Sequence, residues 1–429
     1  MAVDVTTGKH IDLPPGAFPL LRMADGHTDI ETICAKAKQK YNARELAVRN
    51  FFTNLSRMGF LTLSAMPKTP TRNGKAPIRV ASIELTDKCN LKCVYCYGHF
   101  APSKNKIITF NEASNLFNSL AERNVRVVEL SGGEPTTNPE FDEIFEYACE
   151  LFMSVTIMTN AVTIRDSTYK TFRDHSDKVN FSISIDGFSE ATNNSQRGVH
   201  DTFRKTIDNI LRIKQEINPK LLRIVYMLTE ENEAEADALF DFMISHGILD
   251  VMVSIPENVG KGRSRNLPNG CSTCENLNKP HGLLGKRLQE IGNKYVPKIR
   301  TIGDRLGKSG LQIANAIPTC GAGWTMLSFQ ADGRVMPCNM MSDKWCLGNF
   351  KEDPSLNFLS FENPLYDYFA NFNLSADDSN RAECGKCTYN SYCGKCINKV
   401  LLANQRRVEQ GSPLCPVLAR NKSFTPCEP

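Results

Sequence analysis

Between residues 79 and 256, short apolar runs alternate with longer amphipathic stretches. The apolar runs lie at 79–85, 126–130, 153–159, 179–185, 221–228 and 250–255. The amphipathic stretches lie between them, at 111–123, 139–151, 165–174, 200–217 and 232–246. Strands alternating with helices predict repeated βαβ units and a parallel sheet. Six strands do not close an eight-stranded barrel, so the pattern predicts an α/β fold with a partial (β/α)6 TIM barrel, whose chemistry lies at the carboxyl ends of the strands.

The first 66 residues predict a separate small module. Thr28 followed three residues later by Glu31 predicts a capping box, and helical spacing continues from Ile30. A second helix is predicted over 43–58, ending at Gly59, with a short strand at 60–63. Two helices followed by a strand predict a winged helix-turn-helix-like domain.

The rest of the chain divides by composition. Residues 67–78 are rich in Pro, Lys and Gly, which predicts a linker. Residues 257–319 are rich in Gly, Asn and Lys and form a bridging region. Residues 320–429 combine short predicted strands with cysteine-rich loops.

Length and charge narrow the class of protein. A chain of 429 residues is long enough for two or three domains. Its net charge of +4 shows no strong basic bias, so no nucleic-acid partner is expected, and the KGRSR stretch at 261–265 is expected to be solvated surface. The sequence shows neither a long uncharged apolar run nor a signal peptide, so we expect a soluble, cytoplasmic protein without a membrane partner.

Sixteen cysteines are unusual in such a chain. Thiols stay reduced in the cytoplasm, so clustered cysteines indicate metal binding rather than disulfides. Three lie at 89–96 and eight lie between 320 and 415, which predicts two metal regions. Cys34 and Cys149 are interpreted as small buried apolar residues. Cys271 and Cys274 form an isolated C-x₂-C pair, interpreted as reduced loop thiols whose role stays open.

Cys89, Cys93 and Cys96 follow the first predicted barrel strand with the spacing C-x₃-C-x₂-C. Three thiolates can hold a [4Fe–4S] cluster and leave one iron without a protein ligand, and such an open iron suits catalysis. A structural zinc site is the alternative. It would need a fourth ligand, for which His99 is the near candidate.

With Tyr95 in the aromatic position, this motif resembles the signature of the radical S-adenosylmethionine (SAM) superfamily over about residues 79–256. The resemblance implies that the open iron binds the amino and carboxylate groups of S-adenosylmethionine. It further implies that reductive cleavage yields a 5′-deoxyadenosyl radical, which abstracts a hydrogen atom from a substrate.

Further motifs lie where that family would bind S-adenosylmethionine. Gly132 and Gly133 would allow close backbone approach, and Glu134 would accept from the methionyl ammonium. Asn160, at the end of the third strand, resembles a ribose contact. Ser184 and Arg197 would hold the methionyl carboxylate, a task that suits a guanidinium. The alternative for Arg197 is an ordinary surface ion pair.

The C-terminal cysteines include two C-x₂-C pairs, which alone are typical of a zinc ribbon. After a radical SAM signature they resemble the SPASM extension, which implies two auxiliary [4Fe–4S] clusters. By that resemblance one cluster takes Cys384, Cys387, Cys393 and Cys415, and the other takes Cys320, Cys338 and Cys396. Cys346 is a candidate fourth ligand of the second, whose iron could instead be open. Only two residues separate Cys393 from Cys396, whereas the family pattern has three.

The N-terminal module resembles a RiPP recognition element, which binds the leader of a ribosomally made peptide as an added strand. Together the modules resemble a peptide maturase that forms C–S or C–C cross-links, supplied with electrons by a flavodoxin or ferredoxin. The alternatives are a SPASM oxidase or epimerase acting on another substrate, and an iron–sulfur regulator that binds DNA. The sequence identifies neither a catalytic side chain, the modified residue, nor the oligomeric state.

Overall fold

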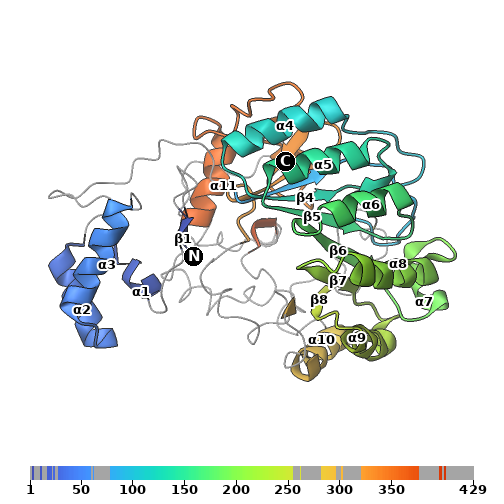
Figure 1. Cartoon of the computed structure of the whole chain (residues 1–429), viewed down its shortest axis with the longest axis horizontal. Helices are drawn as coiled ribbons and strands as arrows, with labels where there is room; N and C mark the ends of the chain where they lie inside the picture. The colour runs from blue at the N-terminus through green and yellow to red at the C-terminus, as the bar shows by residue number, and fades with distance from the viewer. Residues whose placement is uncertain are drawn as a thin grey trace, which may run out of the picture. The chain divides into compact units, whose positions relative to one another are not determined.

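The computed structural model describes residues 2–3, 10–11, 17–21, 23–24, 28–58, 61, 78–254, 261, 282–295, 301–302, 320–375, 396–398 and 401. The chain separates into two compact units, Met1–Pro77 and Ile78–Pro429 (Figure 1). No helix among the described residues is long and apolar enough to cross a membrane.

The N-terminal unit is built on a pair of helices. A two-stranded antiparallel sheet pairs β1 (Ala2–Val3) with β2 (His10–Ile11), and a short helix α1 (Ala17–Leu21) follows. The unit's core lies between α2 (Ile30–Tyr41) and α3 (Glu45–Arg57), where Cys34 packs against Phe52 within one buried cluster. Burial of Cys34 agrees with its interpretation as a small apolar residue.

The helix α2 begins one residue later than the predicted capping box requires. Its N-cap is Asp29, whose carboxylate accepts from the Thr32 amide at 2.7 Å. The predicted capping box of Thr28 and Glu31 is therefore wrong: the N-cap is Asp29. An aspartate side chain at the N-cap accepts from the first amides of a helix as well as a threonine does. The predicted strand at 60–63 lies largely outside the described residues.

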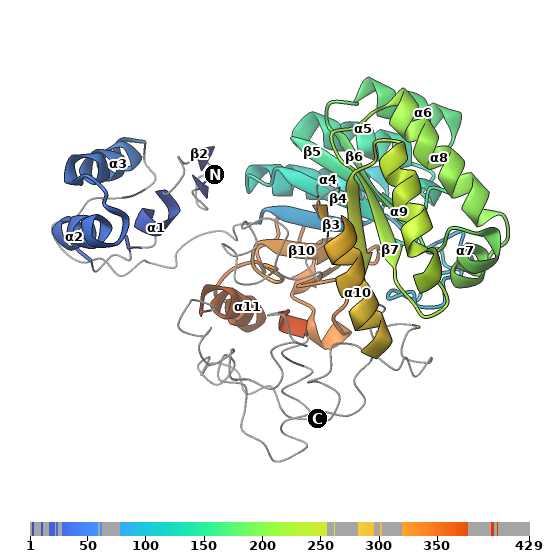
Figure 2. The ribbon, with the colours of Figure 1, turned by 90° about the horizontal axis from the view of Figure 1, so that it is seen from below.

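All six predicted barrel strands are present and parallel. They are β3 (Val80–Glu84), β4 (Val127–Ser131), β5 (Ser154–Thr159), β6 (Val179–Ile185), β7 (Leu222–Met227) and β8 (Asp250–Ser254), and they lie side by side in chain order. The helices that connect them lie on the outer side of the sheet (Figure 2): α4 (Phe110–Glu122), α5 (Phe141–Leu151), α6 (Asp166–Asp174), α8 (Thr202–Glu216) and α9 (Ala236–Ser245).

The sheet extends beyond those six strands at both edges. The strand β9 (Thr301–Ile302) pairs with β8, and β10 (Met326–Phe329) pairs in parallel with β3. The antiparallel strands β11 (Arg334–Met336) and β12 (Gly348–Asn349) complete the order on the β10 side. The cysteine-rich region is therefore joined to the barrel by main-chain hydrogen bonds. Two further helices, α10 (Gly282–Tyr295) and α11 (Pro364–Ser375), lie in the same unit.

The core lies between the sheet and its outer helices. Along β7, Leu222, Ile224 and Tyr226 are buried, while the residues between them are half-buried on the inner face. Aromatic side chains fill the outer layer: Phe172 of α6 meets Phe145 of α5 and Phe181 of β6 edge to face, with ring centroids 5.1 and 5.0 Å apart. This packing fixes the strand ends from which the site is built.

Removing one of these rings tests the packing. Phe172 is fully buried, so Phe172→Ala is expected to lower the free energy of unfolding by about 3–5 kcal/mol. Met153, which is 60% exposed, provides the control, and Met153→Ala should change it by less than about 0.5 kcal/mol. Chemical denaturation followed by circular dichroism measures both, and equal effects would contradict the packing described.

Candidate iron–sulfur and cofactor site

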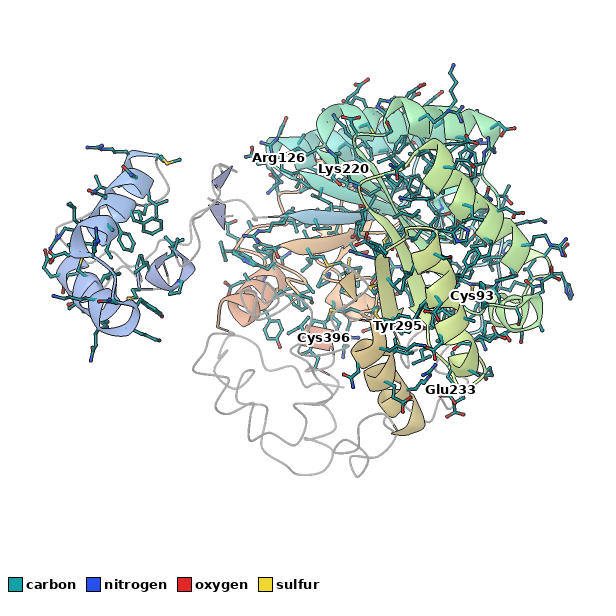
Figure 3. The ribbon with its side chains drawn as sticks, turned by 60° about the horizontal axis from the view of Figure 1, so that its bottom comes forward. Cys93, Arg126, Lys220, Glu233, Tyr295 and Cys396 are labelled. Atoms are coloured by element: carbon teal, nitrogen blue, oxygen red, sulfur yellow. The ribbon has the colours of Figure 1, made fainter. Side chains whose placement is uncertain are left out.

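The loop that follows β3, residues 85–101, is named the cluster loop because it carries the first three cysteines. Cys89 is buried with Leu91 and Phe100, and Cys93 and Cys96 pack against this group. Cys93 of this loop and Cys396 of the C-terminal region belong to the same unit (Figure 3). The three predicted ligands of the first cluster are thus gathered at the carboxyl end of the sheet.

A helix that the sequence pattern did not reveal supports the cluster loop. The helix α7 (Glu190–Arg197) ends at Gly198. Its last carbonyls accept hydrogen bonds from the loop: Lys92 N donates to Arg197 O at 3.0 Å and Val94 N to Gln196 O at 3.1 Å. A Cβ on Gly198 would lie 2.6 Å from Lys92 O, so only glycine permits this approach.

On the other side, the cluster loop is held by the loop after β4. Gly133 N donates to Thr86 O at 2.8 Å, and Glu134 N donates to Lys88 O at 2.9 Å. Cβ atoms on Gly132 and Gly133 would lie 2.4 and 2.2 Å from the backbone oxygens of Thr86 and Lys88. These glycines therefore permit loop-to-loop packing. The cofactor contact predicted for them stays a prediction.

The Glu134 carboxylate is 1% exposed and extensively hydrogen-bonded. Oε1 accepts from the Thr136 hydroxyl at 2.8 Å, from the Thr136 amide at 3.3 Å and from the Thr159 hydroxyl at 2.7 Å, and Oε2 accepts from Asn160 N at 2.8 Å. Burial raises the pKa of Glu134, and these hydrogen bonds oppose that rise. Oε2 makes fewer contacts than Oε1, so it is the atom with room for an ammonium donor.

Asn160 follows β5 and lies beside the first cysteine. Its side-chain amide donates to Asn90 Oδ1 at 2.8 Å and lies 4.0 Å from Cys89 Sγ, while its Oδ1 accepts from Val162 N at 2.9 Å. Asn160 thus links the third strand end to the cluster loop. Its predicted ribose contact stays a prediction, as does the role of Ser184, which is half-buried in β6.

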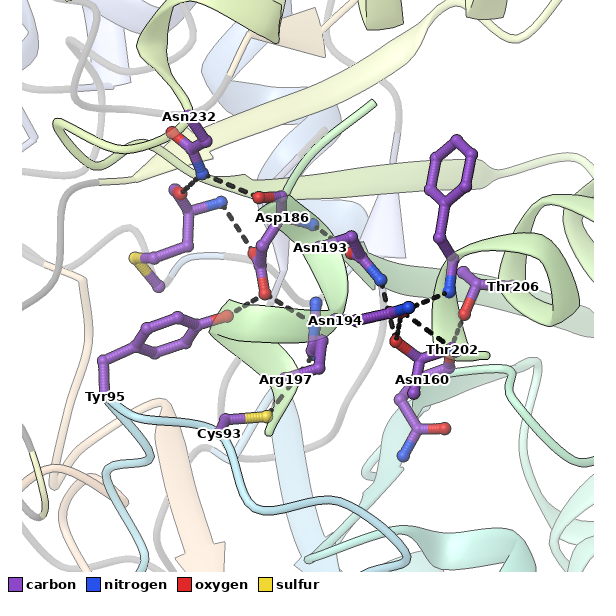
Figure 4. A network of polar contacts seen from close by, with 12 residues as sticks. Cys93, Tyr95, Asn160, Asp186, Asn193, Asn194, Arg197, Thr202, Thr206 and Asn232 are labelled. Atoms are coloured by element: carbon purple, nitrogen blue, oxygen red, sulfur yellow. Dashed lines mark hydrogen bonds and ion pairs between the residues drawn. The ribbon is translucent and has the colours of Figure 1, made fainter. Parts of the chain in front are cut away.

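Arg197 is not a surface residue. It is 6% exposed, and its Nε lies 2.5 Å from Asp186 Oδ2 while its Nη1 lies 3.9 Å from Cys93 Sγ (Figure 4). Asp186 also accepts from the Tyr95 hydroxyl. The third guanidinium nitrogen, Nη2, is buried and has no hydrogen-bond partner among the described residues. A buried unpaired donor is costly, so a ligand acceptor at this point is the expected partner.

The residues present fit a cluster and an S-adenosylmethionine molecule. Burial, together with the nearby Glu134 and the other two cysteines, raises the pKa of the Cys89 thiol to about 12, so metal binding here must displace a proton. No three His, Cys, Asp or Glu side chains of the described part of the chain converge on one ion. A four-iron cluster does not require that convergence, because each thiolate binds a different iron. The orphaned Nη2 of Arg197 supplies a donor for a carboxylate.

The C-terminal cysteines are partly described. Burial raises the pKa of Cys338 to about 12, and Cys396 and Cys320 lie near enough to add to that rise. Their assignment to one auxiliary cluster stays a prediction. Cys346 is half-buried and donates its thiol to Gly348 O at 3.3 Å. Cys384, Cys387, Cys393 and Cys415 lie outside the described residues, as do Cys271 and Cys274.

The expectation that residues 261–265 are solvated is wrong for Lys261, and residues 262–265 lie outside the described part of the chain. Lys261 begins the basic stretch expected to be solvated, yet it is half-buried against the cluster loop. Its amide donates to Cys96 O at 2.9 Å and its ammonium to Phe100 O at 3.1 Å. Lys261 therefore also helps to hold the cluster loop.

The fold and this arrangement define an iron–sulfur enzyme that uses S-adenosylmethionine. Residues 83–243 match the radical SAM superfamily, and residues 320–388 match the SPASM family, an iron–sulfur cluster-binding domain. The chain is a radical SAM enzyme with a SPASM domain, and its cofactors are [4Fe–4S] clusters and S-adenosylmethionine.

Relatives extend this comparison over the whole chain. The antilisterial bacteriocin subtilosin biosynthesis protein AlbA of Bacillus subtilis is 23% identical over 94% of this chain and 88% of its own. The AdoMet-dependent heme synthase of Methanosarcina barkeri is 24% identical over 79% of this chain and 96% of its own. Streptococcus suis SuiB bound to the precursor peptide SuiA shares the fold, with a TM-score of 0.59 at 16% identity, over 97% of this chain and 95% of its own.

Sequence reasoning did not single out Glu84, the last residue of β3. Its side chain is 5% exposed and hydrogen-bonds Tyr97 of the cluster loop, whose hydroxyl also hydrogen-bonds Asn339, the neighbour of Cys338. Burial, with a further contribution from Asp332, raises the pKa of Glu84 to about 8. A carboxylate at the end of a mostly apolar strand was the signal available in the sequence.

The raised pKa of Glu84 predicts a pH dependence of stability. The folded protein keeps this proton up to about pH 8, whereas the unfolded chain loses it near its ordinary value of 4.5, so stability falls as pH rises through that window. Glu84→Gln is expected to remove this slope and raise the thermal midpoint more at about pH 9 than at about pH 5. The exposed Glu150→Gln is the control, and an unchanged slope in Glu84→Gln would contradict the assignment.

Proposed function

We propose that this enzyme is a peptide maturase that abstracts hydrogen from a ribosomally synthesised precursor and forms a C–S or C–C cross-link. The observation that carries the proposal is the extent of the match to AlbA. The match covers 94% of the chain. The unmatched 6% is fewer residues than the 77 of the N-terminal unit, so the match to AlbA must include part of that unit. The relative named for subtilosin biosynthesis thus has a counterpart of the N-terminal unit as well as of the enzyme core.

The match to SuiB supports the same reading. Its 97% coverage includes most of the N-terminal unit, and SuiB binds the precursor peptide SuiA. We assign the N-terminal unit the role of binding the leader of the precursor, as an added strand beside β1 and β2. Main-chain hydrogen bonds would supply the affinity, so a leader of variable sequence could bind.

In the first cluster site, Cys89, Cys93 and Cys96 would hold three irons. When bound, the reduced cluster and S-adenosylmethionine would supply a 5′-deoxyadenosyl radical. Glu134 Oε2, which accepts one hydrogen bond from Asn160 N, would accept from the methionyl ammonium, and the unpartnered Nη2 of Arg197 would donate to the carboxylate. Asn160, whose side chain is bonded to Asn90, would contact the ribose. The cluster loop, packed between α7 and the loop after β4, keeps these groups in fixed relation and limits the access of water.

The same chemistry releases an electron and requires an electron donor. Forming a cross-link removes two hydrogen atoms from the peptide: one goes to the deoxyadenosyl radical, and the other leaves as a proton and an electron. Cys320, Cys338 and Cys396 would hold an auxiliary cluster, which would supply an acceptor for that electron. A flavodoxin or ferredoxin would serve as the electron donor of the first cluster. The clustered cysteines must stay reduced to bind iron, so we expect the reaction to take place in the cytoplasm.

Anaerobic reconstitution tests this proposal. The enzyme should bind about twelve irons per chain and produce 5′-deoxyadenosine with dithionite, and the Cys89/Cys93/Cys96→Ala variant should lose about four irons and all deoxyadenosine. Co-expression with short reading frames encoded beside this gene should yield a peptide lighter by two hydrogens per cross-link. Unchanged peptides, with deoxyadenosine still formed, would point to another substrate. Loaded clusters without deoxyadenosine would point to an iron–sulfur regulator.

Cys346 tests the ligands of the auxiliary cluster. Its thiol is engaged with Gly348 O, and it is not among the groups that raise the pKa of Cys338. Cys346→Ala is therefore expected to keep the Mössbauer spectrum and iron content of that cluster, leaving one iron open to exchangeable ligands. Cys338→Ala is the matched control that should lose the cluster. Loss of the cluster in Cys346→Ala would identify Cys346 as the fourth ligand.

A further inference from the structure

Asp186 is the centre of a buried polar network that reaches both the cluster loop and α7 (Figure 4). It follows β6 directly, and its side chain is 1% exposed. Oδ2 accepts from the Tyr95 hydroxyl and from Arg197 Nε, while Oδ1 accepts from Met227 N at 3.2 Å. One carboxylate thus joins the cluster loop, helix α7 and strand β7.

The position of Asp186 is fixed by residues outside the cluster loop. Its amide donates to Asn193 Oδ1 at 3.0 Å, and its carbonyl accepts from Asn232 Nδ2 at 2.9 Å. Asn232 is itself held, because the same Nδ2 lies 2.7 Å from Met227 O. Both asparagines are at most 1% exposed. The backbone of Asp186 is therefore held by residues outside the cluster loop, on β6, α7 and the segment after β7.

This anchoring decides the direction of the guanidinium of Arg197. Nε is bound to Asp186 and Nη1 faces Cys93 Sγ, and a guanidinium is planar and rigid. With two of its nitrogens placed, the third cannot turn independently. Nη2 therefore points to one buried position, where the described residues offer it no acceptor.

We propose that Asp186 is a positioning residue, which aims Arg197 Nη2 at the carboxylate of S-adenosylmethionine and holds Tyr95 of the cluster loop against the same frame. The proposal rests on the assignment of Arg197 to that carboxylate made above. It assigns to Asp186 no contact with the cosubstrate.

The charges explain why a carboxylate suits this role. Asp186 neutralises the charge of Arg197, so the buried pair carries no net charge that would attract anions in general. What remains is a directed donor at Nη2, which favours a carboxylate in one place. A neutral residue at 186 would keep the volume but lose this direction, because an amide cannot accept from Arg197, Tyr95 and Met227 as the carboxylate does.

The test compares two ligands of the cluster-loaded protein by anaerobic equilibrium dialysis: S-adenosylmethionine and decarboxylated S-adenosylmethionine, which lacks the carboxylate. The wild-type protein should prefer the first. Asp186→Asn should reduce this preference roughly ten- to hundredfold, the factor expected when a hydrogen bond to a charged group is lost. The affinity of Asp186→Asn for decarboxylated S-adenosylmethionine should equal that of the wild type. Glu190→Gln is the matched control on α7, because Glu190 pairs with Arg204 at 2.8 Å on the exposed side.

A double variant separates positioning from a general structural role. In an Arg197→Met background, Asp186→Asn should cause no further loss of preference, because residues that act as a unit are not additive. An equal loss of affinity for both ligands, or a further loss in that background, would overturn the proposal. An unchanged preference in Arg197→Met alone would remove its premise, whereas failure of the peptide assay would leave this result untouched.

Asp186→Glu keeps the test decisive if Asp186→Asn does not retain its cluster. The longer carboxylate preserves the charge but displaces the guanidinium by about one methylene, so the preference should again fall while decarboxylated ligand still binds. A preference equal to that of the wild type in Asp186→Glu would show that the direction of Arg197 does not matter and would overturn the proposal.

Discussion

The site depends on main-chain hydrogen bonds that tie three loops together at one edge of the sheet. The cluster loop donates from Lys92 and Val94 to the end of α7 and accepts at Thr86 and Lys88 from the loop after β4. These contacts need glycine at the points of closest approach. The backbone path that carries the three thiols is therefore fixed by main-chain contacts, and the surrounding side chains add to them.

Much of this architecture was predictable because local patterns carry it. Six parallel strands repeat a β-branched, apolar composition, and the spacing of Cys89, Cys93 and Cys96 is a local signal. The helix α7 was missed because it is short and strongly polar, so it has no apolar period. The strands β10 to β12 are too short to stand out, and their pairing with β3 is a non-local contact that spacing does not encode.

The site residues show the same division. Sequence placed Glu134, Asn160 and Arg197 at strand ends or just beyond them, and the structure gathers all three around the cluster loop. It did not reveal that Arg197 is paired with Asp186, or that Glu84 interacts with Tyr97. Those relations depend on side chains meeting across elements distant in the chain. In a sequence, the only signal of a buried carboxylate is a polar residue at a position where an apolar one is expected.

The pairing of β3 with β10 has a consequence for folding during synthesis on the ribosome. The first strand of the barrel lies between β4 and β10, and β10 is made more than 240 residues after it. Until synthesis reaches that point, one edge of β3 lacks its partner and is open to wrong pairing with other chains. Contacts of such long sequence separation also slow folding. This edge of the barrel strand therefore stays open until synthesis has reached residue 329 of 429.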